Sequence, residues 1–289
     1  TVELVLDAKI YDTEDFKWNT GVVFSTTNNT VSELNINPRI EGPDNGVVFR
    51  LEEGVEFGTM YGRDFVRSLD QMATQLPAGR TIDEYTVNAD GVVVDASTIG
   101  TQYESAIIRQ NADGSVWVGE IGNSVADFNL GLRNTMSYKG FDFYMLWDWK
   151  QGGDLYNRNG QWLTRDNRNK IIDQAGKAQA EKKTVNYYQS LNDVNQNNGY
   201  WVEDASFVKL REVSLFYTLG KDKLKNIANG FFDSLRIGVT GNNLLTFTNY
   251  SGWDPEVQLY DASTFQYYAV DFGVYPVATT YTMSVTLKF

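Results

Sequence analysis

The chain of 289 residues contains no cysteine and no histidine. It therefore has no thiol nucleophile, disulfide or imidazole base, and it lacks the usual ligands of zinc, haem and iron–sulfur centres. Carboxylate catalysis is the enzyme chemistry that remains, but acid pairs such as Asp64/Asp70 and Glu203/Asp204 arise by chance in a chain with 37 acidic residues. We predict that the protein is not an enzyme and that it has no cofactor or metal centre.

Basic residues and long apolar runs are also scarce. The chain has 25 Lys+Arg against 37 Asp+Glu, a formal net charge of -12, and such a surface repels the phosphates of nucleic acids. No apolar run approaches the roughly 18 residues that a transmembrane helix needs. The mean hydropathy of -0.38 does not exclude the membrane, because the strands of a transmembrane barrel alternate between lipid-facing and lumen-facing residues.

Proline is rare, with 5 residues, whereas aromatic residues make up 14% of the chain, a composition that favours strands. Apolar and polar residues alternate with a period of two in seven segments. These segments lie near residues 1–10, 16–24, 130–138, 141–149, 213–219, 235–239 and 281–289. The longer ones reach about ten residues, the length that a tilted strand needs to cross a bilayer. Asn134 interrupts the apolar face of its segment.

The connections between these segments alternate between short and long. Short ones lie around Asp12, at Lys139-Gly140 and over 221–233, and long polar ones lie over 28–127, 151–204 and 249–279. Outer-membrane barrels have short periplasmic turns and long extracellular loops, so the pattern predicts an all-β fold, an antiparallel transmembrane β-barrel segment. A soluble or surface carbohydrate-binding β-sandwich, whose strands also alternate, is the alternative. We expect a further hairpin of wall strands between Val47 and Val118, and a helix within the first long loop, over 63–76.

The number of strands predicts an incomplete barrel. Single-chain bacterial barrels close with an even number of at least about eight strands, and open edges in lipid leave backbone groups unpaired. The chain begins at Thr1, inside an alternating segment and without a methionine or a leader. We therefore expect a fragment that forms a barrel only together with the remainder of the same wall.

Residues 88–95 (NADGVVVD) space oxygen ligands somewhat like a calcium loop, with Asn88, Asp90 and Asp95 as candidate ligands. The run lacks the full set of alternating carboxylates and the glutamate at the twelfth position of such loops. A hairpin turn at the Asp-Gly pair is the favoured interpretation.

Eight aromatic side chains in the predicted extracellular loops are candidates for ligand binding, because rings gain little in water but stack on sugar rings and peptide side chains. They are Trp162, Tyr187, Tyr188, Trp201, Trp253, Tyr260, Tyr267 and Tyr268. The alternative is that these rings pack on one another and stiffen the loops. Phe289 closes the last alternating segment, and we expect it to be the terminal aromatic that the barrel-assembly machinery reads.

Several stretches resemble the SusC/RagA family of TonB-dependent transporters. The most specific are residues 204–219 (DASFVKLREVSLFYTL), 235–256 (LRIGVTGNNLLTFTNYSGWDPE) and 271–276 (DFGVYP). Upstream stretches that also fit are 15–18 (DFKW), 58–62 (GTMYG), 131–135 (GLRNT) and 138–141 (YKGF), whereas 63–127 matches little. The motif residues Asn242, Asn243, Gly252, Asp254 and Pro255 look architectural, and we expect them to shape the exit from strand to loop.

The resemblance implies that residues 1–289 are the C-terminal part of a bacterial outer-membrane barrel of about 22 strands. It implies active import of an oligosaccharide or a peptide, captured between the extracellular loops and a SusD-like surface lipoprotein. The internal plug and the N-terminal segment that contacts TonB are not in this chain. The expected partners are thus the rest of the barrel with its plug, the lipoprotein, TonB and the ligand, and no nucleic acid.

Overall fold

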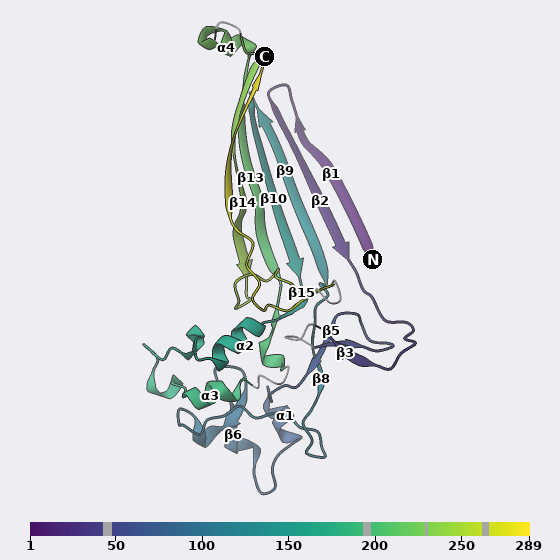
Figure 1. Cartoon of the computed structure of the whole chain (residues 1–289), viewed down its shortest axis with the longest axis vertical. Coiled ribbons are helices and arrows are strands. Elements are labelled where there is room, and N and C mark those ends of the chain that lie inside the picture. The colour runs from purple at the N-terminus through teal and green to yellow at the C-terminus, as the bar shows by residue number, and fades with distance from the viewer. Residues whose placement is uncertain (43–47, 193–197, 229–230, 262–265) are drawn as a thin grey trace.

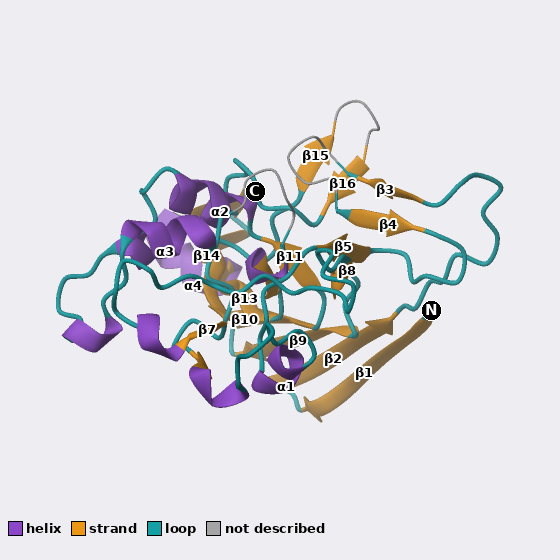
Figure 2. Cartoon of the chain, turned by 90° about the horizontal axis from the view of Figure 1, so that it is seen from below, coloured by secondary structure: helices purple, strands orange, loops and turns teal. Residues whose placement is uncertain are grey.

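The largest element of the computed structural model, which describes residues 1–42, 48–192, 198–228, 231–261 and 266–289, is a seven-stranded antiparallel sheet (Figure 1). Its strands, in spatial order, are β1 (Val2–Asp12), β2 (Phe16–Thr26), β9 (Phe128–Tyr138), β10 (Phe141–Gln151), β13 (Phe207–Gly220), β14 (Ser234–Thr248) and β17 (Thr280–Lys288). They are the seven segments that the alternation predicted. Viewed from below, along the long axis of Figure 1, the strands follow an arc behind the loops (Figure 2).

The pairing register places the apolar residues of neighbouring strands on one face of this sheet, which we call the bilayer face. One row across the face runs through Leu6, Val22, Leu132, Trp147, Leu210 and Leu245. The other face, which we call the inner face, carries polar and charged residues such as Asp7, Arg133 and Asp142. Because side chains alternate along every strand, this register confirms the apolar-out, polar-in pattern of a barrel wall.

Asn134, the polar residue on the bilayer face, has a partner there. The indole Nε1 of Trp18 donates a hydrogen bond of 3.0 Å to its side-chain oxygen. The two residues are diagonal neighbours, because Thr20 is paired with Asn134 and Trp18 with Met136. An amide that would be costly in lipid is thereby hydrogen-bonded within the wall.

The connections separate by length between the two ends of the sheet, as predicted (Figure 1). At one end, the turn end, lie the short joins β1–β2 and β9–β10 and the helix α4 (Lys221–Ala228) between β13 and β14. At the other end, the loop end, three long segments form a separate layer. The helix in the third join was not predicted from the sequence.

The loop layer contains small sheets and short helices. The sheets are formed by β3 (Arg39–Glu41), β4 (Phe49–Leu51), β5 (Thr59–Gly62) and β8 (Gly119–Asn123), by β6 (Tyr85–Val87) with β7 (Val93–Asp95), by β11 (Asp154–Tyr156) with β12 (Val202–Asp204), and by β15 (Leu259–Asp261) with β16 (Gln266–Tyr268). The helices are α1 (Leu69–Ala73), α2 (Arg158–Arg165) and α3 (Val185–Ser190), with 3-10 turns at Ile82–Glu84, Ala96–Thr98, Lys170–Ile172, Gln179–Glu181 and Gly199–Trp201. None of the helices in the described ranges has the length and apolar character needed to span a membrane.

Two expectations for residues 28–127 need correction. A hairpin does form between Val47 and Val118, from β6 and β7, but it is a separate two-stranded sheet and adds nothing to the wall. The helix expected over 63–76 is confined to Leu69–Ala73. Its start is fixed by Ser68, whose hydroxyl caps the Gln71 amide, and the preceding Val66 is held in extended pairing with Ile107.

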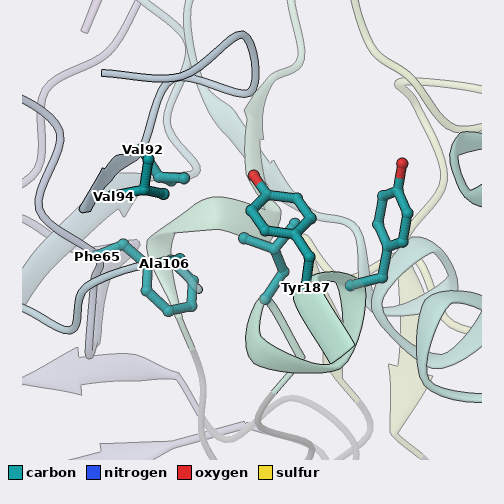
Figure 3. Packing of buried hydrophobic residues seen from close by; sticks show 7 residues of the cluster. Phe65, Val92, Val94, Ala106 and Tyr187 are labelled. Atoms are coloured by element: carbon teal, nitrogen blue, oxygen red, sulfur yellow. The ribbon is translucent and has the colours of Figure 1, made fainter. Parts of the chain in front are cut away.

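A hydrophobic core joins two of the loops to each other (Figure 3). Phe65, Val92, Val94 and Ala106 come from the segment between β2 and β9, and they pack with Tyr187, Tyr188 and Leu191 from the segment between β10 and β13. Burial of these side chains stabilises the loops as one layer with its own interior. The cavity described next is built on that layer.

Candidate functional site

The loop layer contains a cavity of about 780 Å³. Its walls come from α2 and the turn after it, from residues 200–203, and from two parts of the β14–β17 connection, residues 251–253 and 271–275. The volume lies within the range of typical small-molecule sites. The cavity therefore has the size of a ligand site, and its walls come from segments distant in sequence.

Asn157 ties three of these segments together. Its side-chain oxygen accepts a hydrogen bond from the Gly160 amide and so caps α2, while its side-chain nitrogen donates to Glu203 Oε1 at 2.8 Å and to Ser251 Oγ at 3.1 Å. Glu203 in turn accepts the Ser251 amide through Oε2. The backbone nitrogen of Asn157 also donates to the Trp201 carbonyl. Because these bonds are mutual, one wall of the cavity holds the next in place.

A second set of hydrogen bonds, around Asp271, holds the far wall. Asp271 Oδ1 accepts from Asn159 Nδ2 at 2.7 Å, and Oδ2 accepts from the Tyr250 hydroxyl at 2.7 Å. Burial raises the pKa of Asp271, an effect that these two hydrogen bonds oppose. Burial, together with the nearby Asp271 charge, also raises the pKa of Tyr250. The Asp271 carboxylate and the Tyr250 hydroxyl are engaged in hydrogen bonds within the protein, so they are poor candidates for chemistry on a ligand.

The rim of the cavity offers groups that are free to meet a ligand. Trp253 and Tyr275 line it with exposed fractions of 71% and 89%. Arg168 and Lys170 are exposed cations in the lining, with no ion-pair partner among the described side chains. Aromatic faces beside cations and amide groups suit a ligand that carries rings or apolar groups together with hydroxyl or carboxylate groups.

One buried ion pair and several partly buried ones fix the Trp253 side of the cavity to the wall. Lys209 on β13 donates from Nζ to Asp254 Oδ1 at 2.6 Å and to Glu256 Oε2 at 2.7 Å. Arg211 on the same strand bonds Glu256 and, at 2.6 Å, Asp148 on β10. Burial opposes the ionisation of Glu256, but the hydrogen bonds and charges of Arg211 and Lys209 outweigh it and lower the pKa of Glu256. We call the pair Lys209–Asp254 the latch.

Two of the five motif residues, Asn242 and Asn243, connect β14 to the segment that leads into β17. Asn243 adopts a φ of 52° in the middle of β14, a left-handed conformation that asparagine tolerates better than most residues. Its Nδ2 donates to the Ala278 carbonyl, and its own carbonyl accepts from the Thr279 hydroxyl. Asn242 donates to Thr280 Oγ1. These bonds attach the last residues of the β14–β17 connection to β14.

The eight aromatic candidates separate into different environments. Tyr187, Tyr188 and Trp201 are buried, the first two within the core of Figure 3. These three side chains therefore fit the alternative interpretation, in which the rings pack within the loops. Trp201 is nevertheless one of the residues that line the cavity. Trp162 is half-buried, beneath the Arg165 guanidinium at 3.8 Å and beside the Phe272 ring.

The other candidates lie in the β14–β17 connection. Trp253 lies on the rim of the cavity, and the Tyr268 ring packs on Phe49 with centroids 5.3 Å apart. The side chains of Tyr260 and Tyr267 lie outside the described residues, although their backbones pair in β15–β16. The geometry thus brings Trp201 and Trp253 together at one cavity and leaves Trp162 and Tyr268 in packing contacts elsewhere.

Sequence reasoning missed Tyr275, Arg168 and Lys170. Tyr275 lies within the recognised stretch 271–276, where an aromatic exposed beside a proline could have been singled out. Arg168 and Lys170 lie in a run of polar residues after α2 that gives no periodic signal. Only the fold of the loop brings these two cations to the cavity.

The calcium-like run forms a hairpin turn. Asn88 accepts backbone hydrogen bonds from Asp90 and Val92 through its side-chain oxygen, and Asp90 accepts from the Tyr187 hydroxyl at 2.7 Å. Asp95 is engaged separately, with Arg80 and Ser97. Within the described ranges no group of three or more acidic residues is placed to hold a metal ion. The three candidate ligands therefore have separate protein partners. That the chain binds no metal ion stays a prediction.

The chain is similar to TonB-dependent receptors. Relatives from Formosa agariphila include TonB-dependent receptor P39, 27% identical over 88% of this chain, and TonB-dependent receptor P3, 24% identical over 99%. No family model matches the chain. It spans only 27% and 28% of the length of these two relatives. They confirm the resemblance inferred from the motifs, and with it an outer-membrane location and a protein class other than enzymes.

Solved structures show the same fold. A structure of the RagAB peptide transporter matches 99% of this chain with a TM-score of 0.67 and 19% identity, and the chain covers 29% of that structure. The RagAB importer in its open-open state matches with a TM-score of 0.63 and 17% identity. The wall of antiparallel strands with a loop layer at one end is therefore the fold of part of such a barrel.

Proposed function

We propose that the chain is the C-terminal part of an outer-membrane importer that takes up an oligosaccharide or a peptide, and that the loop cavity is part of its ligand vestibule. The strands supply a sector of the barrel wall. The loop layer supplies a preorganised surface at the loop end, which we assign to the cell exterior. The observation that carries the proposal is the attachment of a structured, cavity-bearing layer to one end of a wall with an apolar face.

The soluble sandwich has less support. Sandwiches bury the apolar face of one sheet against a second sheet about 10 Å away. In the described part of the chain, the bilayer face exposes Leu4, Leu6, Val239 and Met283, with no second sheet of comparable size to cover them. Lipid is the environment in which such a face is stable.

The partners follow from the open edges and from the resemblance. Strands β1 and β17 are the two edges of the sheet, and we propose that they pair with the remaining strands of the same barrel. The proposed assembly also includes a plug within that barrel, TonB acting through the plug, and a SusD-like lipoprotein over the loop end. In this arrangement the ligand enters between lipoprotein and loops, and remodelling of the plug by TonB admits it.

One experiment tests the assembly. The native protein is isolated from membranes in detergent, and the intact mass and peptide map of every co-purifying chain are measured. We expect a parent chain of about three times this length and a lipoprotein of separate sequence. A 32.7 kDa species that remains soluble without detergent would contradict the proposal.

A second experiment tests the cavity. Trp253→Ala and Tyr275→Ala are introduced in the full-length transporter, and uptake is measured with labelled peptide and oligosaccharide mixtures. We expect each variant to raise the half-saturating concentration by about fivefold for one ligand class, since a lost stacking contact costs about 1 kcal/mol. Tyr103→Ala is the matched control, because Tyr103 is equally exposed but lies outside the cavity. Equal effects at all three positions would remove the cavity from the proposal.

A further inference from the structure

Helix α4 lies against the bilayer side of the sheet at the turn end. The Lys223 ammonium donates to the Tyr217 hydroxyl at 2.8 Å and lies 5.3 Å from the centre of its ring. Tyr217 belongs to the bilayer face, on the same side of β13 as Val213 and Leu215. Leu224 is buried. The helix therefore buries Leu224 and lies outside the wall, where lipid surrounds a barrel.

Two aromatic rings extend this surface. Phe231, just after α4, stacks on Phe289 with ring centroids 6.3 Å apart and planes 26° apart. Phe289 continues the apolar row of β17 through Val285 and Leu287. Exposed fractions of 70% for Phe231 and 84% for Phe289 are costly in water. At the boundary between acyl chains and headgroups, such rings are stabilised.

The charge of this surface has the opposite sign to that of the chain. Residues 221–233 carry three lysines and two aspartates, a net charge of +1, while the whole chain carries -12. Lys221 is paired with Asp233 at 2.6 Å. Lys225 is exposed, and among the described side chains it has no ion-pair partner. A free ammonium beside exposed rings complements a phosphate headgroup above an acyl layer.

We propose that α4, Phe231 and Phe289 form an interfacial anchor that binds anionic phospholipid headgroups at the turn end of the barrel. Lys225 contacts the lipid phosphate, and the two rings insert at the acyl boundary. Lys223 holds the helix against Tyr217 and so sets its height relative to the wall. The anchor depends on the orientation of the bilayer face and not on the transported ligand, so it can fail while the proposed import function stands.

Lipid retention tests the anchor. The full-length transporter is reconstituted in nanodiscs of phosphatidylglycerol and phosphatidylcholine, released into the gas phase and weighed with its bound lipids. We expect preferential retention of phosphatidylglycerol, reduced about fivefold by Lys225→Gln, the ratio that corresponds to roughly 1 kcal/mol per lysine near a membrane surface. Lys17→Gln is the matched control, an exposed lysine at the same end but on the inner face. Equal retention in the two variants overturns the proposal.

A depth measurement provides an independent test. A nitroxide is attached at Phe231→Cys or at Lys17→Cys in a full-length chain with no other cysteine, and its collisions with oxygen and with a water-soluble nickel complex are compared. Oxygen dissolves in the acyl layer, so we expect it to dominate at position 231, while nickel dominates at position 17. Nickel accessibility at 231 equal to that at 17 would place the segment in water and refute the anchor.

Discussion

The indole nitrogen of Trp18 on β2 donates a 3.0 Å hydrogen bond to the side-chain oxygen of Asn134 on β9. Both side chains lie on the bilayer face, where neither group can be satisfied by water. In the sequence, Asn134 interrupts the apolar face of its segment. The bond explains how this polar side chain is accommodated there. It also gives the bilayer face an internal test.

Replacing Asn134 should destabilise the wall through the partner left behind. Asn134→Leu leaves the Trp18 N–H without an acceptor in lipid, at a cost of about 1–2 kcal/mol. Trp18→Phe removes the donor as well, so the double variant should be less destabilised than the two single changes together. The measurement is the free energy of unfolding of the full-length protein, by urea titration in detergent, for all four members of the cycle. Strict additivity would mean that the bond contributes nothing.

The amount of structure that the sequence predicts differs between wall and loops. In the wall, alternation specifies strand position and facing, because a shift of one residue would turn the apolar set away from lipid. In the loops, contacts between distant segments determine the structure. The bond from Asn157 to Glu203 and the core around Tyr187 have no periodic signal. The sequence therefore could not predict the cavity, and it could not predict which of the candidate aromatics are buried.

Gly238 on the inner face should not tolerate a side chain. It is paired directly with Phe216 on β13, and a Cβ built at Gly238 would lie 2.1 Å from that ring. We expect Gly238→Ala to displace the ring, which also lies 4.5 Å from the Arg236 guanidinium. Overpacking of this kind costs about 1–3 kcal/mol. The readout is a lower midpoint of heat unfolding, followed by the change in electrophoretic mobility of the barrel.

The matched control for this prediction is Gly220→Ala, at the end of β13. A Cβ at Gly220 has no neighbour within 4 Å, so its midpoint should remain close to that of the wild type. A second substitution, Phe216→Leu, should restore part of the stability of Gly238→Ala by making room. Failure of this rescue would show that contact with the ring is not the cause.

The β6–β7 hairpin should loosen in acid. Hydrogen bonds to the Asp95 carboxylate from the Ser97 hydroxyl, from Arg80 and from the Ser97 amide lower its pKa to about 2. Because the folded pKa lies below the unfolded value of about 3.9, the stabilisation is complete above that value and is lost as the pH falls from about 4 towards 2. Amide exchange of a peptide over 80–98, corrected for its intrinsic pH dependence, should accelerate in that window.

The variant Asp95→Asn separates this effect from general acid unfolding. Exchange over 80–98 should then be faster than in the wild type at neutral pH, and its additional acceleration between pH 4 and 2 should disappear. Asp70→Asn, an exposed carboxylate change in the same loop, should leave the wild-type profile intact. Identical profiles for Asp95→Asn and the wild type would contradict the assignment.

The latch should hold the Trp253 side of the cavity. Lys209→Met preserves most of the side-chain volume but leaves Asp254 buried without its cation, and breaking a buried pair in this way costs about 3–5 kcal/mol. Because Trp253 is adjacent to Asp254, we expect faster amide exchange over 249–258 and a higher half-saturating ligand concentration for uptake. Asp254→Asn in the same chain removes the stranded charge, so the double variant should recover part of the protection.

The exposed ion pair Lys9–Asp12 provides the control for Lys209→Met. Lys9 and Asp12 form an ion pair at the turn end, with exposed fractions of 74% and 52% for their side chains, and such pairs contribute about 0–1 kcal/mol. Lys9→Met should therefore leave exchange over 249–258 and uptake unchanged. If Lys209→Met behaved like Lys9→Met, burial would not be what gives the latch its strength. The orientation of Trp253 would then have to depend on bonds that do not involve Lys209, such as those from Ser251 to Glu203 and from the Val277 amide to Asp254.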